Sequence, residues 1–255
     1  MNIRFDGKMV LVTGAGTGIG AAMATAFATS GARVALHYGK SREKAEEVAA
    51  SIGSRGGEKP LLVQADVLDG PAIEKMVRAV MSNLGSIDVL VNNAGGMLDR
   101  SEVDCMPEET YREVMDLNMG SIFRTSRCVV PHMKARKKGV IINLSSIAAR
   151  NGGGGGAVVY AAAKAAVSTF TRGLARELAP FNIRVNGIAP GIVLTPFHDK
   201  STPPEMLRRL IDSIPLGRAA APEEIAGAGI FLASDQLSSF ITGEIIGVNG
   251  GALMA

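Results

Sequence analysis

The sequence contains no tryptophan, and only 4% of its 255 residues are aromatic. Grooves that stack the bases of nucleic acids depend on aromatic side chains, so this composition disfavours such a groove. The net charge is only +3. The one dense basic run, Lys134 to Lys138, is interpreted as the solvated end of a helix, where cations are favoured. Nucleic acid is therefore not an expected partner.

Cysteines, histidines and long apolar runs are also scarce. Cys105 and Cys128 have no spacing typical of a disulfide framework or a metal site, so we expect reduced thiols, with Cys128 in a helix core. The three histidines lie far apart, which predicts surface or capping roles and no metal. No segment approaches the ~20 apolar residues of a membrane span, and the polar residues 1–8 do not resemble a signal peptide. We expect a cytoplasmic protein without a membrane partner.

Short apolar runs alternate with longer amphipathic segments along the whole chain. Hydrophobic residues make up 47% and charged residues 20%, which is enough for a large core. Strands are expected at 9–13, 33–38, 61–65, 89–92, 140–144, 184–188 and 244–248, and helices at 18–30, 43–52, 72–84, 108–134, 158–178 and 223–234. Near-continuous apolar strands joined by helices predict a doubly wound parallel sheet covered on both faces. The sequence therefore predicts one α/β domain over residues 1–255.

One segment departs from this alternation. Residues 190–215 are rich in proline and show little periodicity. Long irregular segments in compact domains are often functional. We therefore interpret 190–215 as a candidate substrate lid.

A glycine-rich turn follows the first expected strand, with the sequence Thr13-Gly-Ala-Gly-Thr-Gly-Ile-Gly20. Glycine allows the backbone to turn sharply and to approach a pyrophosphate, and the free amides at a helix start attract its negative charge. A turn without ligand is the alternative for such a sequence taken alone. Its place between the first strand and the first helix predicts a dinucleotide site.

Tyr160 and Lys164 are four residues apart in an expected helix, so their side chains share one face. A phenol titrates near ~10, and a nearby ammonium group lowers that pKa. The pair can therefore exchange a proton with a carbonyl or alcohol oxygen. Taken alone, a Tyr and a Lys at this spacing more often lie on the protein surface without a catalytic role.

Four motifs, in order along the chain, resemble those of the short-chain dehydrogenase/reductase family. They are the turn at 13–20, Asn92-Asn93-Ala94-Gly95, Tyr160-x-x-x-Lys164, and Pro190-Gly191 followed by Thr195. The resemblance implies a single-domain Rossmann-type fold with seven strands. It also implies an NAD(P)-dependent oxidoreductase that needs no metal and moves a hydride between the nicotinamide ring and a carbonyl or alcohol carbon.

The resemblance also implies roles for individual residues. Tyr160 exchanges the proton, Ser146 holds the substrate oxygen (with Ser145 as the alternative), and Asn118 completes a proton relay to Lys164 or kinks its helix. The cofactor would contact Gly14, Thr17, Gly18, Ile19, Gly20, Tyr38, Lys40, Asp66, Val67, Asn93, Ala94, Gly95, Tyr160, Lys164, Pro190, Gly191, Val193 and Thr195. Of these, Asp66 and Val67 would bracket the adenine, although an acidic helix cap is a compatible role for Asp66.

The residue at the end of the second expected strand distinguishes a site for NAD from a site for NADP. An acidic residue there binds the ribose 2′-hydroxyl and repels a 2′-phosphate. This chain has Tyr38 at that place, with Lys40 and Arg42 nearby. Thr17 and Gly39, where relatives that use NADP often carry a basic residue, are uncharged. We expect NADP(H) to be preferred, with NAD(H) as the alternative.

The substrate is predicted from the resemblance alone. The chain looks closest to the family's 3-oxoacyl-thioester reductases, including those that act on acyl carrier protein, and to its sugar or polyol dehydrogenases. Carrier-protein reductases carry basic residues flanking the cleft; Lys137 could be one, but Phe181 stands where a second is expected. We expect reduction of a 3-oxoacyl thioester or related ketone, with sugar, polyol or secondary-alcohol oxidation as the alternative. A non-enzymatic regulator is disfavoured because Tyr160 and Lys164 are both present.

The surplus of small and apolar residues in the expected helices 108–134 and 158–178 predicts an oligomer. The C-terminal run 245–251 also resembles the interface strand of the family. Closed symmetry is the default for soluble homo-oligomers. We expect a homotetramer.

Overall fold

The computed structural model describes residues 3–254, apart from the side chains of residues 199–201. Seven parallel strands form one sheet in the order β3-β2-β1-β4-β5-β6-β7. They are β1 (Met9–Val12), β2 (Arg33–Tyr38), β3 (Leu61–Gln64), β4 (Val89–Asn92), β5 (Gly139–Leu144), β6 (Ile183–Pro190) and β7 (Ile245–Val248). The strand order reverses between β1 and β4, and ligands of such sheets bind at the carboxyl ends of the strands at that point. The predicted doubly wound Rossmann-type fold is confirmed.

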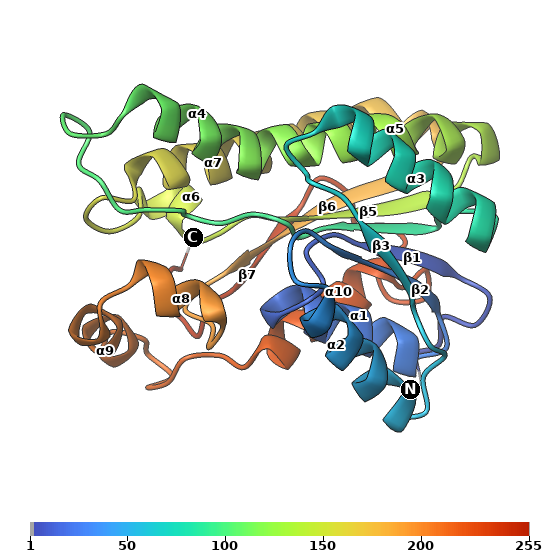
Figure 1. The fold of residues 1–255 in the computed structure, drawn as a ribbon, viewed down its shortest axis with the longest axis horizontal. Helices are drawn as coiled ribbons and strands as arrows, with labels where there is room; N and C mark the ends of the chain where they lie inside the picture. Colours follow the sequence, from blue (N-terminus) through green and yellow to red (C-terminus); the bar gives the residue numbers. More distant parts are fainter. Residues whose placement is uncertain (1–2, 255) are drawn as a thin grey trace.

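Helices cover both faces of the sheet (Figure 1). On one face lie α1 (Gly18–Thr29), α2 (Arg42–Ser54) and α10 (Pro222–Ala233), and on the other lie α3 (Gly70–Leu84), α4 (Glu108–Met115), α5 (Ser121–Arg136) and α7 (Val158–Leu178). Successive strand residues point to opposite faces. Val10 and Val12 therefore pack into one hydrophobic core, while Leu11 packs into the other. Cys128, predicted in a helix core, is only half-buried on α5 at the edge of the second core, and Cys105 is exposed; both are free thiols.

The single helix predicted at 108–134 is interrupted. Between α4 and α5 the chain makes one π-helical turn, Asp116–Gly120, and α5 continues to Arg136. The Asn118 amide donates to Val114 O at 2.8 Å and to Gly96 O at 2.7 Å. A side chain that bonds the helix backbone in this way competes with the regular ladder. The interruption therefore coincides with the residue for which the sequence suggested a kink.

Short helices occur where the sequence showed too few turns to predict them. Within 190–215 lie α8 (Pro196–Ser201) and α9 (Pro204–Asp212), and both begin with proline, which is suited to a first helical position. A further short helix, α6 (Ala148–Asn151), follows β5, and a 3₁₀ turn, Ala179–Phe181, precedes β6. Residues 190–215 are therefore less irregular than predicted. Their role as a lid stays a prediction.

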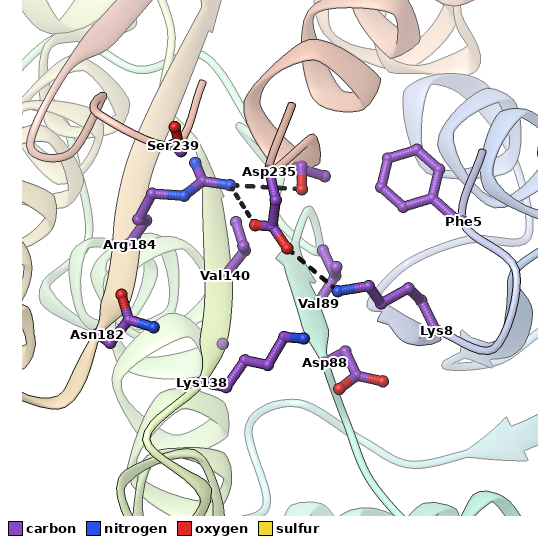
Figure 2. A pocket seen from close by; sticks show the side chains of 12 residues that line it. Phe5, Lys8, Asp88, Val89, Lys138, Val140, Asn182, Arg184, Asp235 and Ser239 are labelled. Atoms are coloured by element: carbon purple, nitrogen blue, oxygen red, sulfur yellow. Dashed lines mark hydrogen bonds and ion pairs between the residues drawn. The ribbon is translucent and has the colours of Figure 1, made fainter. Parts of the chain in front are cut away.

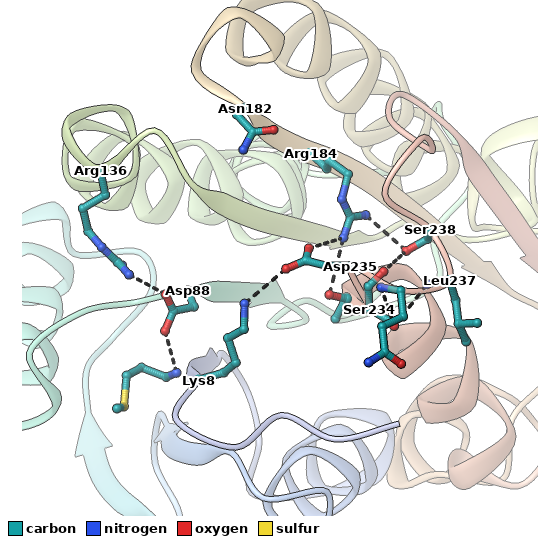
Figure 3. A network of polar contacts seen from close by, with 12 residues as sticks. Lys8, Asp88, Arg136, Asn182, Arg184, Ser234, Asp235, Leu237 and Ser238 are labelled. Atoms are coloured by element: carbon teal, nitrogen blue, oxygen red, sulfur yellow. Dashed lines mark hydrogen bonds and ion pairs between the residues drawn. The ribbon is translucent and has the colours of Figure 1, made fainter. Parts of the chain in front are cut away.

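A polar cavity of about 350 Å³ lies at the amino edge of the sheet, where β4, β5 and β6 begin (Figure 2). Lys8 and Arg184 both contact the Asp235 carboxylate, at 3.2 Å and 3.3 Å. Asp88 accepts hydrogen bonds from Arg136 at 2.6 Å and from the Met9 amide at 2.8 Å. These ion pairs, shown in Figure 3, join β1, β4, α5, β6 and the end of α10. We interpret them as structural, because the motifs described above lie at the opposite edge of the sheet.

In the described part of the chain, no helix is both long and apolar enough to cross a membrane.

Candidate active site

The glycine-rich turn joins β1 to α1 at the point where the strand order reverses. Gly14 and Gly18 have φ angles of +63° and +55°, in the left-handed region that favours glycine. A Cβ on Gly20 would lie 2.3 Å from the carbonyl oxygen of Gly14. Thr17 precedes α1 without making a side-chain cap, so the first amides of the helix are available to an anion. The turn has the properties of a phosphate-binding site.

A second motif holds this turn from the neighbouring strand. The Asn93 side chain donates to Thr13 O at 2.9 Å and to Gly14 O at 3.0 Å. In return, the Thr13 hydroxyl accepts from the amides of Asn93 and Ala94. Residues about 80 positions apart meet because β1 and β4 are adjacent in the sheet. Thr13 and Asn93 therefore fix the shape of the turn.

Tyr160 lies on the first turn of α7, at the carboxyl end of the sheet. Its hydroxyl is hydrogen-bonded to Ser146, and burial raises the pKa of the phenol to about 12. Its ring centroid lies 5.8 Å from that of Phe197 on α8. Ser145, the alternative partner, is buried, and its hydroxyl donates to Lys164 O and contacts Ser168. Of the two serines, the structure places Ser146 beside Tyr160.

Lys164 is buried beneath Tyr160, and its ammonium group donates to Leu144 O at 2.8 Å. Burial lowers the pKa of this group to about 8. The expectation that Lys164 depresses the Tyr160 pKa is wrong for this structure, in which the phenol pKa is raised. The reason is that Tyr160 is partly withdrawn from water, and the ammonium group of the buried Lys164, 5.8 Å from the ring centroid, donates its hydrogen bond to Leu144 O.

Asn118 lies next to Lys164, separated from it by Gly95. The Asn118 side chain is fully buried and forms a pair of hydrogen bonds with Gly96, to N at 3.1 Å and to O at 2.7 Å. A Cβ on Gly95 would lie 2.8 Å from Asn118 Oδ1 and 3.2 Å from Lys164 Nζ. Glycine at 95 therefore leaves open the space between the two polar groups, which any larger side chain would fill.

The loop after β6 folds back over the phosphate turn. Thr195 Cγ2 lies 3.1 Å from the position that a Cβ on Gly18 would occupy. Gly191 donates to Val248 O on β7, and Val193 pairs with Ala220. Pro190, Gly191, Val193 and Thr195 are thereby brought to the same edge as Tyr160.

The adenosine side of the turn is bounded by β2 and α2. A Cβ on Gly16 would lie 3.8 Å from Tyr38 Cβ and 3.9 Å from the Ala45 amide near the start of α2. Lys40 is exposed, whereas Arg42 is paired with Glu46 at 2.8 Å.

Asp66, beyond the end of β3, accepts a hydrogen bond from the Leu68 amide at 2.9 Å. It is not the helix cap considered as its alternative role, because α3 is capped by Asp69, whose side chain accepts from the Ala72 amide at 3.2 Å. The adenine contact of Asp66 stays a prediction. Val67 beside it is buried.

His37 was expected at the surface or at a helix cap, and this was wrong. It lies on β2 and is 1% exposed, with both ring nitrogens hydrogen-bonded. The adjacent Tyr38 stands where the residue that selects the cofactor is expected. A single histidine within an apolar strand, by contrast, is only a weak indication of a functional side chain.

Lys137 and Phe181 do not flank the Tyr160 site. They precede β5 and β6, and the Asn182 side chain, which lines the cavity at the amino edge, contacts Lys137 O. Six residues of β5, about 20 Å, separate that edge from the carboxyl edge. These two positions therefore give no support to carrier-protein binding at the Tyr160 end.

Hydride transfer with a nicotinamide cofactor needs a phosphate-binding turn and a proton-donating group on the same side of the fold. This chain places both at the carboxyl edge of a doubly wound sheet, beside its topological switch point. The fold and site define a dinucleotide-dependent oxidoreductase.

Comparison with known proteins agrees with this class. A family model described as enoyl-(acyl carrier protein) reductase matches residues 14–252. The chain is 40% identical over 247 residues to a 3-oxoacyl-[acyl-carrier-protein] reductase of Staphylococcus aureus strain Mu50, covering 97% of this chain and 98% of the relative. It is 36% identical over 252 residues to the 7alpha-hydroxysteroid dehydrogenase of Escherichia coli strain K12, covering 99% and 96%.

A solved structure of a 7alpha-hydroxysteroid dehydrogenase with NADH and 7-oxo glycochenodeoxycholic acid superposes with a TM-score of 0.92 at 36% identity, covering 100% of this chain and 97% of that one. The chain belongs to the short-chain dehydrogenase/reductase family and is an NAD(P)-dependent oxidoreductase.

Proposed function

We propose that this enzyme uses NADPH to reduce a ketone carried on an apolar substrate, such as a 3-oxoacyl thioester or a related ketone. The observation that carries the proposal is the Phe197 ring against Tyr160, together with apolar side chains exposed at the same edge of the sheet. The Phe197 ring packs on Tyr160, and the Met206 methyl group lies 3.1 Å from the Cβ position of Gly154, on the glycine run before α7. Val158 and Leu194 are also exposed at this edge. The hydroxyl groups of a sugar or polyol would find no hydrogen-bond partners on such apolar surfaces.

The proposed roles follow from the protonation states. Since the phenol pKa is about 12, Tyr160 keeps its proton at neutral pH and can donate it to a carbonyl oxygen. The Ser146 hydroxyl, hydrogen-bonded to Tyr160, would hold the same oxygen. The bound nicotinamide supplies the hydride. Lys164 would hold the ribose next to that ring, with Asn118 behind it to pass on a proton.

The names of the relatives support an apolar substrate. One is a reductase of 3-oxoacyl chains and the other a dehydrogenase of a hydroxysteroid. In both, the reacting carbon is carried on a hydrocarbon body. These are substrates of the relatives, and they suggest which compounds to assay first.

The NADPH preference rests on charge at the end of β2. No carboxylate occupies the end of β2 at Tyr38, and the exposed Lys40 follows it just before α2. Because the contact would be solvent-exposed, we expect a preference of roughly tenfold rather than a strict one.

We also propose a homotetramer. Tyr111 on α4, Phe123 on α5 and Phe240 before β7 are large apolar side chains exposed on the single chain. Burial of such groups against a second copy is favourable. Light scattering at micromolar concentration should return four times the mass of 26.5 kDa; a monomer mass would contradict the proposal.

The decisive experiment is a panel of ketones, 3-oxoacyl thioesters, with and without carrier protein, and sugars. Each is incubated with NADPH or NADH, and oxidation is followed by the absorbance of the reduced nicotinamide ring. We expect the highest kcat/KM for an apolar ketone or acyl thioester with NADPH. Turnover confined to sugars or polyols would refute the apolar substrate, and no turnover of any compound would refute the proposed function.

A further inference from the structure

His37 lies on β2 directly beneath the phosphate turn. Its Nδ1 accepts a hydrogen bond from the Gly14 amide at 3.0 Å. Its Nε2 lies 3.1 Å from Ala65 O, at the end of β3. Since a carbonyl can only accept, Nε2 carries the proton and Nδ1 is the acceptor. The two contacts thus require the neutral ring with its proton on Nε2.

These contacts complete the anchoring of the turn. Asn93 holds the carbonyl groups of Thr13 and Gly14 from the β4 side. From the β2 side, the His37 ring holds the Gly14 amide and the His37 carbonyl accepts from the Ala15 amide at 2.8 Å. The peptide groups around Gly14, which has a left-handed conformation, are therefore fixed on both sides.

We infer that His37 is a positioning residue for cofactor binding: its neutral imidazole holds the Gly14 amide and so sets the conformation of the phosphate turn. Protonation of Nδ1 would place two donors, Nδ1–H and the Gly14 amide, against each other. The Gly14 amide would lose its acceptor in a buried site, and the turn would have to move. Binding of any dinucleotide would then weaken, because the pyrophosphate is common to NAD(H) and NADP(H).

The surroundings keep the ring neutral near pH 7. Burial lowers the pKa of His37, while the hydrogen bond to Ala65 O and the nearby Asp66 carboxylate act in the opposite direction. Among the described residues, Asp66 is the one charged group that acts on this ring. Residues 13–20, β1 and β3 contribute no charged side chain. Protonation is therefore expected only below the ordinary histidine pKa of about 6.5.

The test measures the dissociation constant of each cofactor by fluorescence titration of the full-length enzyme, in wild type, His37→Leu and His37→Gln. In His37→Leu the buried Gly14 amide loses its acceptor. The affinities for NADPH and NADH should therefore both fall by the same factor, roughly tenfold. Glutamine can accept from Gly14 and donate to Ala65, so His37→Gln should lose less. The exposed histidine of α5 provides the control variant, His132→Leu, which should bind both cofactors as wild type does.

A pH series separates positioning from general stability. NADH is used, because the 2′-phosphate of NADPH titrates in the same range. Wild-type affinity for NADH should fall as the pH drops below about 6.5, and His37→Gln should show no such fall. The inference would be overturned if a folded His37→Leu bound NADH as tightly as wild type does. It would also be overturned if the affinity of His37→Gln for NADH fell at acid pH as that of wild type does.

The inference rests on the cofactor site of the proposed function, but its test needs no substrate. If wild type bound neither cofactor, the proposed function would fail. If wild type bound both and the His37 variants matched it, only the role of His37 would fail.

Discussion

A methyl group added at Gly20 should disrupt the phosphate turn, whereas one added at Gly16 should not. In Gly20→Ala the new Cβ would lie 2.3 Å from Gly14 O and 2.4 Å from Asn93 Nδ2. Ordinary contact begins at 3.4 Å, so these atoms must move by about 1 Å. In Gly16→Ala the nearest atom, Tyr38 Cβ, is already 3.8 Å away. The two variants therefore add the same atom to the same turn with opposite steric outcomes.

The magnitude follows from the rigidity of the contact. Overpacking of this kind costs about 1–3 kcal/mol, and alanine returns up to ~1 kcal/mol through its better helix propensity. The melting temperature of Gly20→Ala should therefore fall by only a few degrees. Displacement of the Gly14 carbonyl acts directly on the turn, so the affinity for NADPH should fall by roughly tenfold to a hundredfold.

Both quantities are measured on the two variants and wild type, by thermal unfolding without cofactor and by fluorescence titration with NADPH. Gly16→Ala should match wild type within about threefold in affinity. Equal affinities for Gly20→Ala and Gly16→Ala would show that the turn is less tightly packed against α1 and Asn93 than the distances indicate.

Three further predictions concern the reaction centre and the cofactor. Tyr160→Phe should bind NADPH normally but lose ~10²–10⁴-fold in kcat, since the proton donor is gone; a near-normal rate would mean that the proton comes from elsewhere. Lys164 has a pKa of about 8 when folded and ~10.4 when unfolded, so the unfolded chain holds the extra proton between these values. The free energy of unfolding of wild type, measured by denaturant titration, should therefore rise relative to that of Lys164→Met as the pH rises from about 8 to about 10. Parallel pH profiles for the two proteins would contradict the burial of the Lys164 ammonium group. Tyr38→Asp should reverse the preference to NADH, and Lys40→Ala should weaken the binding of NADPH but not of NADH. If the ratio of the NADPH and NADH dissociation constants were unchanged in both variants, the 2′-phosphate would be recognised by other groups.

Several features of the site could be predicted because they are encoded locally. The glycines of the turn are required by backbone conformation, and Tyr160 and Lys164 share a face because a helix repeats every 3.6 residues. The edge on which Lys137 and Phe181 lie was also encoded, since both precede strands and all strands of a parallel sheet start at one edge. That signal was missed. The positions of α8 and α9 could not be predicted, since helices of six and nine residues contain too few turns for a periodic pattern.

By itself, the sequence determined the order of the strands and of the longer helices, the phosphate turn, and the chemical groups available at the carboxyl edge. Only the tertiary structure decided which of those groups meet. Asn93 reaches Thr13 because β4 pairs with β1, and His37 supports Gly14 because β2 lies on the other side of β1. It also decided the protonation of Tyr160 and Lys164. The shift of a pKa on burial depends on how completely distant segments exclude water from a group, and no local pattern in the chain records that.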